Sequence, residues 1–129
     1  MESTSRRIRV LVADDSPTAL RSICRYLEYA GEFEIVGTAR DGQHVLQQAE
    51  RFRPDLVLAD LSMPQLNGFE ATMELRRSFP KMRVLIFSEL SGASLREECV
   101  RSGADGFVEK SQMPEKLMQE VRKLFPKNS

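Results

Sequence analysis

The chain has 129 residues, a length that fits one compact domain and leaves little room for a second. Hydrophobic residues make up 41% and charged residues 29% of it, and 19 basic residues equal 19 acidic ones, so there is no cationic excess for nucleic acid. No apolar run approaches the roughly 20 residues of a membrane span, and the N-terminus lacks the apolar core of a secretory signal. We therefore expect a cytoplasmic domain over residues 1–129, with a core of about 8–125, that binds neither nucleic acid nor membrane.

Short apolar runs alternate with longer amphipathic ones along the chain. The first run, Ile8–Ala13, is rich in branched residues and predicts a buried strand. Ser16-Pro17 then predicts a helix start, because a capping residue precedes a proline at the first helical position. Four more strands are predicted at Glu34–Ala39, Asp55–Ala59, Met82–Phe87 and Gly106–Glu109.

An amphipathic segment follows each of these strands. The fourth of them is predicted to be a helix from about Ser91 to Ser102, and Pro114 is predicted to open the last helix. Five strand and helix units argue for a parallel sheet covered on both faces, in a doubly wound order, since eight units are needed to close a barrel. The apolar residues expected to pack include Val100, Met73, Met82, Met113 and Met118, and the cysteines Cys24 and Cys99 are expected to be buried thiols.

Polar residues stand at the ends of four predicted strands. Asp14-Asp15 ends the first strand, Asp60 the third, Ser88 the fourth and Lys110 the fifth. Open α/β sheets bind ligands beyond the carboxyl ends of their strands, where the strand order reverses. If the first and third strands are neighbours, the three aspartates meet in one small pocket.

Three converging carboxylates favour a hard divalent cation, because two unit charges near 4 Å repel by about 4 kcal/mol at an effective dielectric constant of 20. Mg²⁺ prefers oxygen ligands and keeps positions for water and phosphate oxygens. A carboxylate can also attack phosphorus to form an acyl phosphate. Asp60 is the best candidate nucleophile and Asp15 the better metal ligand. Lys110 adds positive charge, and the Ser88 hydroxyl can donate to a phosphoryl oxygen.

From about Arg9 to Phe125 the sequence resembles the receiver domain of bacterial response regulators, including the chemotaxis regulators. Each matching motif is weak alone, but in this order and on these strands they are highly specific. The motifs are Asp14-Asp15, Asp60-Leu61-Ser62-Met63-Pro64, Asn67-Gly68, Ser88, and Lys110 after Gly103-Ala104-Asp105-Gly106-Phe107. The resemblance implies a flavodoxin-like, doubly wound, five-stranded parallel sheet of order 2-1-3-4-5.

The resemblance also implies how the acidic residues act. Asp60 would accept a phosphoryl group from a sensor histidine kinase, a phosphotransfer protein or a small phosphodonor. Mg²⁺ would be held by the carboxylates of Asp15 and Asp60, by the backbone carbonyl of Ser62, and by Asp14 largely through water.

The remaining matched residues would report the phosphorylated state. Ser88 and Lys110 would contact the phosphoryl group. Phe107 corresponds to an aromatic switch residue whose ring moves inward when Ser88 shifts. A downstream protein partner would bind the face made by the fourth helix, the fifth strand and the fifth helix.

Two positions depart from the family pattern. Glu89 replaces a small residue after Ser88, and its carboxylate could repel an incoming phosphodonor, which makes it a candidate modulator of phosphorylation. Ser111 replaces a proline that commonly follows the lysine in a cis bond, so this loop is expected to differ.

Two alternative functions remain. A pseudo-receiver would bind partners without phosphorylation, and Glu89 is the one feature in its favour. An aspartyl-phosphate phosphohydrolase would pair Asp60 with a second aspartate two residues later, where Ser62 stands instead. We therefore expect no enzyme beyond catalysis of its own phosphorylation and dephosphorylation. With no room for an output domain after Phe125, we expect a stand-alone receiver or a fragment of a longer protein.

Overall fold

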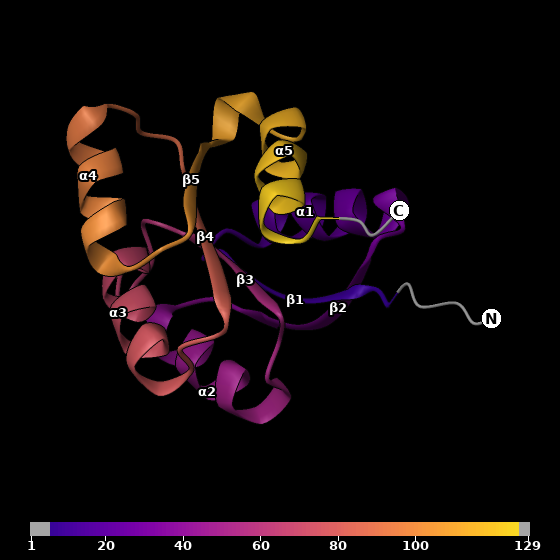
Figure 1. Cartoon of the computed structure of the whole chain (residues 1–129), viewed down its shortest axis with the longest axis horizontal. Coiled ribbons are helices and arrows are strands. Elements are labelled where there is room, and N and C mark those ends of the chain that lie inside the picture. Colours follow the sequence, from indigo (N-terminus) through magenta and orange to yellow (C-terminus); the bar gives the residue numbers. More distant parts are fainter. Residues whose placement is uncertain (1–5, 127–129) are drawn as a thin grey trace.

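The structure is a computed structural model that describes residues 6–126 (Figure 1). Five strands alternate with five α-helices, and one 3₁₀ turn precedes the last helix. Their order is β1 (Ile8–Ala13), α1 (Pro17–Ala30), β2 (Phe33–Ala39), α2 (Gly42–Phe52), β3 (Leu56–Asp60), α3 (Gly68–Ser78), β4 (Arg83–Ser88), α4 (Ala93–Ser102), β5 (Gly106–Glu109), η1 (Lys110–Gln112) and α5 (Glu115–Leu124).

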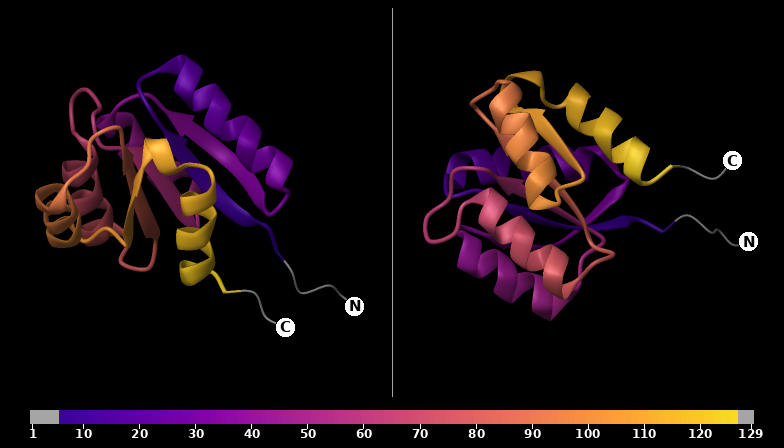
Figure 2. Two further views of the ribbon diagram at one scale, coloured as in Figure 1. Left: turned by 90° about the horizontal axis from the view of Figure 1, so that it is seen from above. Right: turned by 60° about the vertical axis from the view of Figure 1, so that its left-hand side comes forward.

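The strands form one parallel sheet in the order β2-β1-β3-β4-β5, which confirms the predicted doubly wound topology. Helices α1 and α5 cover one face of the sheet, and α2, α3 and α4 cover the other (Figure 2). The order in which strands are added to the sheet reverses between β1 and β3. The loops after these two strands therefore lead to helices on opposite faces and leave a crevice at the carboxyl ends of the strands.

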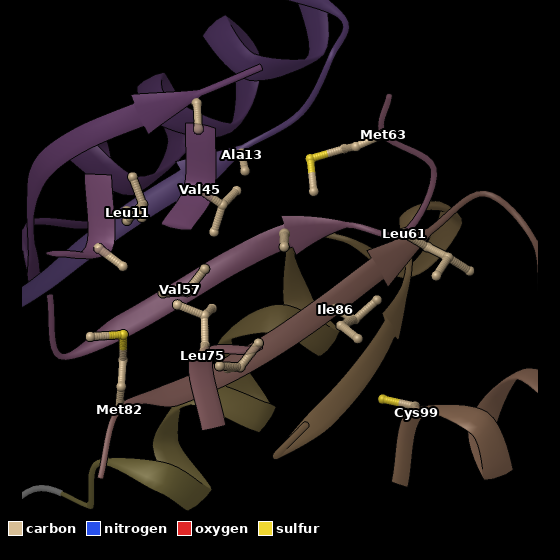
Figure 3. Packing of buried hydrophobic residues seen from close by; sticks show 14 of the residues in the cluster. Leu11, Ala13, Val45, Val57, Leu61, Met63, Leu75, Met82, Ile86 and Cys99 are labelled. Carbon is tan, nitrogen blue, oxygen red and sulfur yellow. The ribbon is translucent and has the colours of Figure 1, made fainter. Parts of the chain in front are cut away.

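Alternate residues of the central strands supply two separate apolar layers. On β1, Leu11 and Ala13 belong to the layer under α2, α3 and α4, whereas Val10 and Val12 belong to the layer under α1 and α5. Figure 3 shows the first layer, with Leu11 and Ala13 among side chains from β3, β4 and the surrounding helices. Strands buried on both faces explain why these runs are continuously apolar instead of alternating.

The predicted element bounds are correct to within one or two residues. The Ser16 hydroxyl accepts a hydrogen bond of 3.2 Å from the backbone of Ala19 and caps α1 as predicted. Helix α4 begins at Ala93, two residues later than predicted, because Gly92 adopts a φ of 128° at its N-cap. Strands β3 and β4 extend one residue further than predicted, so that Asp60 and Ser88 are their last residues.

Arg76 of α3 joins four elements at the edge of the sheet opposite these strand ends. Its guanidinium donates to the backbone carbonyls of Pro80, Met82 and Gly103 at 2.8 to 3.1 Å. It also pairs at 2.8 Å with Asp105, whose carboxylate accepts a hydrogen bond from the first residues of β4. The end of α3, the start of β4, the end of α4 and the start of β5 are therefore fixed to one another.

Two side chains predicted to pack in the interior are exposed instead. Met73 of α3 is 51% exposed and Val100 of α4 is 74% exposed, because α3 buries Ala71 and Leu75 and α4 buries Cys99 instead. Both cysteines are free thiols, Cys99 buried and Cys24 half-buried. Between residues 6 and 126, no helix combines the length and apolar character that a membrane crossing requires.

Candidate functional site

Three aspartates converge at the carboxyl edge of the sheet. Asp14 and Asp15 follow β1, and Asp60 ends the neighbouring strand β3. One carboxylate oxygen from each residue lies within 4.8 Å of the other two. Asp14 is fully buried and Asp60 is 6% exposed, whereas Asp15 is exposed. Parallel pairing of β1 with β3 thus brings Asp60 together with residues that are 45 and 46 positions earlier in the chain, as the strand pattern predicted.

Lys110 brings a positive charge to this acidic group. Its Nζ atom lies 3.0 Å from Oδ2 of Asp14 and 3.6 Å from Oδ1 of Asp60. The second oxygen of Asp14 accepts a hydrogen bond of 2.9 Å from the backbone of Ser16 at the start of α1. The Nζ atom also lies 5.3 Å from the ring centroid of Phe87 on β4. Asp14 therefore orients Lys110 and leaves Asp60 more weakly held.

The surroundings shift the pKa values of Asp60 and Lys110. Burial and the neighbouring charges of Asp14 and Asp15 raise the pKa of Asp60 to about 6, although Lys110 acts in the opposite direction. Burial alone would lower the pKa of Lys110, but its hydrogen bond to Asp14 and the charges of Asp60 and Glu89 raise that pKa above its ordinary value. One lysine is thus insufficient to neutralise three carboxylates, and a further cation would relieve the remaining repulsion.

The Asn67-Gly68 motif fixes the backbone behind Asp60. The Asn67 side chain accepts from the backbone of Glu70, and the Glu70 carboxylate accepts from the backbone of Asn67, which forms a capping box at the start of α3. The backbone of Gly68 donates to Leu61 at 2.8 Å. A Cβ atom on Gly68 would lie 2.9 Å from the carbonyl oxygen of Asp60, so only glycine allows α3 to begin this close to β3.

Ser88 ends β4 beside β3 and is almost fully buried. Its hydroxyl oxygen accepts a hydrogen bond of 2.9 Å from the backbone of Leu90, which leaves the hydroxyl proton free to be donated elsewhere. The next residue, Glu89, is exposed, and its charge contributes to the raised pKa of Lys110. The last residue of β4 and the residue that follows it therefore carry a hydroxyl and a carboxylate, and the carboxylate acts on Lys110 of the acidic site.

An open hollow of about 450 Å³ lies beside Asp15. Its lining consists of Asp15 and six residues of the β3–α3 region: Leu61, Ser62, Met63, Pro64, Asn67 and Phe69. Ser62 is exposed at its rim, two residues after Asp60. The hollow gives solvent and small solutes a path to the exposed carboxylate of Asp15.

Phe107 lies on β5 away from the aspartates. Its ring is 6% exposed and belongs to the apolar layer under α4, together with Ile86 and Cys99. The guanidinium of Arg96 lies 5.3 Å from the ring centroid and also pairs with Glu109 at 3.1 Å. Sequence patterns did not point to Arg96 or Glu109, because nothing in the sequence distinguishes these two charges from others on exposed helix and strand positions.

Among the described residues, Ser111 is not part of a cis peptide bond. Ser111 lies in the 3₁₀ turn Lys110–Gln112, and a cis peptide bond is present between Met113 and Pro114 instead. Pro114 then stands at the N-cap of α5, one residue before the helix begins.

This combination of a doubly wound parallel sheet with acidic residues at the central strand ends defines a receiver-like α/β fold. The model of the response regulator receiver domain family matches residues 10–122, and the chain belongs to this family. The transcriptional regulatory protein DegU of Brevibacillus brevis is 30% identical over 116 residues, which cover 90% of this chain and 49% of that protein. The chain spans 38% to 55% of the length of this and other curated relatives.

Solved receiver structures share the fold closely. A LuxR-family response regulator from Aurantimonas sp. SI85-9A1 has a TM-score of 0.87 and 28% identity, with 92% of this chain and 85% of that chain covered. A chain of the CheX–CheY–BeF₃–Mg²⁺ complex from Borrelia burgdorferi has a TM-score of 0.85 and 26% identity, covering 93% of this chain and 90% of that chain.

Proposed function

We propose that the chain is a phosphorylation-driven switch in which Asp60 accepts a phosphoryl group in the presence of Mg²⁺. The observation that carries this proposal is the convergence of Asp14, Asp15 and Asp60 within 4.8 Å, with Lys110 paired to two of them. Membership of the receiver family supports phosphorylation-based signalling in general. We further propose that residues 8–125 act as one receiver domain.

Each residue of the site would have a separate role in the transfer of a phosphoryl group to Asp60. A carboxylate oxygen of Asp60 would attack phosphorus, and the bond from phosphorus to the donor would break with its electron pair leaving on the donor. Lys110, held by Asp14 at 3.0 Å, would contact the phosphoryl oxygens as a fixed positive charge. The Ser88 hydroxyl, which accepts from Leu90, keeps its own proton for donation to a phosphoryl oxygen.

The donor set fits Mg²⁺, which prefers hard oxygen ligands. Asp15 and Asp60 would hold the ion directly, the backbone carbonyl of Ser62 would add a neutral oxygen, and Asp14 would act largely through water. When bound, Mg²⁺ supplies positive charge that offsets the charge of the carboxylates and of the phosphoryl oxygens. The CheX–CheY complex from Borrelia burgdorferi was solved with Mg²⁺ and BeF₃, a phosphomimetic, and this supports a site for Mg²⁺ and a phosphoryl group in the present chain.

The proposed partners follow from family membership. A sensor histidine kinase or a phosphotransfer protein would supply the phosphoryl group, and a downstream protein would bind the face formed by α4, β5 and α5. In that scheme Phe107 and Ser88 form the switch. A partner detects which of two conformations is populated, and phosphorylation changes that population.

Intact-mass analysis after incubation with acetyl phosphate and Mg²⁺ tests the proposal. We expect the mass of one phosphoryl group on the wild-type chain, and none on the Asp60→Asn variant or in the presence of EDTA. The Asp15→Asn variant should be labelled only at much higher Mg²⁺ concentration. Labelling that survives Asp60→Asn to the same extent would exclude Asp60 as the acceptor.

A phosphorylation-independent interaction module is the second candidate, and the position of Glu89 favours it. This carboxylate lies close enough to Lys110 to affect its pKa and would oppose an incoming anion. The two candidates differ in the labelling experiment, because a pseudo-receiver would show no added mass in any variant, Glu89→Ala included. Release of phosphate from free phosphate esters would instead favour a phosphohydrolase.

A further inference from the structure

The side chain of Arg96 makes the polar contacts between the N-terminal half of α4 and β5, while Leu95 and Cys99 of the same helix pack against the apolar layer beneath. The Nη2 atom of Arg96 lies 3.1 Å from Oε2 of Glu109, and its guanidinium carbon lies 5.3 Å from the ring centroid of Phe107. Arg96 therefore contacts the charged end of β5 and the apolar ring below it at the same time. The side chain lies over Phe107, which is only 6% exposed.

The two residues under Arg96 are close neighbours of Ser88. In the parallel register, Ser88 pairs with Glu109 and Ile86 pairs with Phe107. Because side chains alternate between the faces of a strand, Ser88, Phe107 and Glu109 all belong to the face that α4 covers. Arg96 thus covers the part of this face that lies next to the hydroxyl-bearing end of β4.

The two ends of α4 are held very differently. Its C-terminal end is fixed, since the carbonyl of Gly103 accepts two hydrogen bonds from Arg76. Its N-terminal end begins at Gly92 without a side-chain cap, and residues 89–94 are all exposed. The only described side-chain hydrogen bond to the backbone of this loop runs from Leu90 to the hydroxyl of Ser88. The less constrained end of α4, where Leu95 and Arg96 supply the contacts with the sheet, is therefore the end beside the acidic site.

We propose that Arg96 is a latch that holds the N-terminal half of α4 closed over Phe107 and Glu109. When the latch opens, α4 turns about its fixed end at Gly103 and uncovers the apolar layer beneath it. The bond between Ser88 and Leu90 connects this movement to the acidic site. Only this last connection rests on the proposed phosphorylation of Asp60.

The two contacts of Arg96, with Glu109 and with Phe107, favour the closed position of α4 by a modest free energy. A half-exposed ion pair and one cation–π contact together change an equilibrium by about tenfold. The Arg96 side chain is 46% exposed and that of Glu109 is 22% exposed, so both contacts belong to this modest range. Loss of the latch should therefore raise the population of the open state about tenfold without unfolding the chain.

Cys99 provides a reporter for this movement within the chain itself. It lies on the buried face of α4 in the same apolar layer as Phe107, and its thiol is 3.4 Å from the carbonyl oxygen of Gly106 (Figure 3). It is 2% exposed, and burial raises the pKa of its thiol to about 11. Cys99 lies one turn before the fixed end at Gly103. A thiol reagent therefore reaches it when a tilt of α4 opens the layer as far as that turn, or when the whole chain unfolds.

The test measures the rate at which N-ethylmaleimide modifies Cys99 in a Cys24→Ala background, by intact mass and under native conditions. Arg96→Met keeps the apolar stem and should raise this rate about tenfold. Glu109→Gln removes only the ion pair and should raise it about threefold. Arg101→Met is the matched control, because Arg101 is on the same helix and pairs at 2.7 Å only with Glu98 one turn away.

Equal rates in Arg96→Met and Arg101→Met would overturn the latch, provided that urea titration shows both variants to be folded. If Arg96→Met proves unfolded, Glu109→Gln decides alone, and an unchanged rate in that variant rejects the proposal. In the double variant Arg96→Met, Glu109→Gln, the increase in the Cys99 rate should be smaller than the two single effects combined, because both residues take part in the same contact.

The connection to the acidic site is tested by repeating the labelling after incubation with acetyl phosphate and Mg²⁺. We expect the Cys99 rate to rise about threefold in the wild-type latch and to stay unchanged in Arg96→Met, where the latch is already open. A constant rate in both proteins would reject the connection to Asp60. If no phosphoryl mass is found on the chain, the proposed function fails, whereas the measurements without phosphodonor still decide whether the latch exists.

Discussion

Lys110 is held closer to Asp14 than to Asp60, at 3.0 Å against 3.6 Å between Nζ and the nearest carboxylate oxygen. Asp14 is fully buried and has its second oxygen bonded to the backbone of Ser16. It therefore acts as a fixed counter-charge that keeps Lys110 in place while the Asp60 carboxylate stays available. Because the two charges of the Lys110–Asp14 pair are only 3.0 Å apart, loss of the Lys110 charge should change the stability of the protein by a measurable amount.

Replacement of Lys110 by methionine should lower the free energy of unfolding by about 2 kcal/mol in EDTA, because Asp14 loses its buried partner and the three carboxylates repel one another. Millimolar Mg²⁺ should restore part of this loss, since a ligand that binds only the folded state stabilises it. Urea titration with and without Mg²⁺ measures both effects. The Lys123→Met variant is the control, because the Lys123 side chain is 68% exposed on α5 and pairs with Glu120 and not with the aspartates. An Mg²⁺ response no larger than that of the control would contradict a role for Lys110 in charge balance.

The stability of the metal-free protein should depend on pH through Asp60. Burial and the charges of Asp14 and Asp15 raise its pKa to about 6, against about 3.9 in an unfolded chain. The folded state then binds more protons than the unfolded state between about pH 4 and 6, so the contribution of Asp60 to stability is lost as the pH rises through that window. The Asp60→Asn variant should gain about 1–3 kcal/mol over the wild type at pH 7 and little at pH 4.

Urea titrations of both proteins at several pH values in EDTA provide this measurement. The difference between the two proteins cancels the titration of all other groups. Parallel curves from pH 4 to 7 would show that the Asp60 carboxylate titrates in the folded protein as it does in the unfolded chain.

Removal of the Glu89 charge should speed phosphorylation by small anions. One unit charge about 6 Å from an incoming phosphodonor costs about 0.7 kcal/mol in water, which corresponds to about threefold in rate. Glu89→Gln should therefore be labelled by acetyl phosphate about three times faster than the wild type at low salt, and the difference should shrink at 1 M salt. Glu34→Gln, at an exposed position near the start of β2, is the control. Equal labelling rates in Glu89→Gln and Glu34→Gln would show that the Glu89 charge does not slow phosphorylation.

Arg76→Met should destabilise the fold by about 2–4 kcal/mol, because it breaks hydrogen bonds to three carbonyl groups and the pair with Asp105. Arg77→Met is a matched control on the same helix, since Arg77 pairs only with Glu74 at an exposed position. That control should cost less than about 0.5 kcal/mol. Urea titration distinguishes the two, and similar losses would mean that the junction around Arg76 adds little to stability.

The order of the elements and the identity of the strand-end residues could be predicted because they depend on short patterns. Continuous apolar runs indicate strands that are buried on both faces. The ends of these runs place Asp14, Asp60 and Lys110 at the carboxyl ends of the strands. The start of α4 was predicted two residues too early, because Ser91 is a good capping residue and the unusual φ of Gly92 leaves no trace in the sequence. Met73 was wrongly placed in the core, because α3 buries Ala71 and Leu75 instead.

The polar contacts between distant segments could not be predicted in the same way. Arg96 and Glu109 are 13 positions apart on different elements, and their pairing depends on how α4 lies on the sheet. The choice of Asp14 over Asp60 as the closer partner of Lys110 likewise depends on side-chain conformations and not on spacing. Sequence patterns therefore identify which residues reach the edge of the sheet, and packing decides which of them interact.

The contacts of Arg76 constrain the amino ends of β4 and β5 more strongly than the carboxyl end of β4 is constrained. At one edge a single guanidinium ties together the ends of four elements, and at the other edge the β4–α4 loop is almost entirely in solvent. In the latch proposed above, the contacts of Arg76 would oppose a sliding of the helices along the strands, and α4 would tilt about its C-terminal end at Gly103.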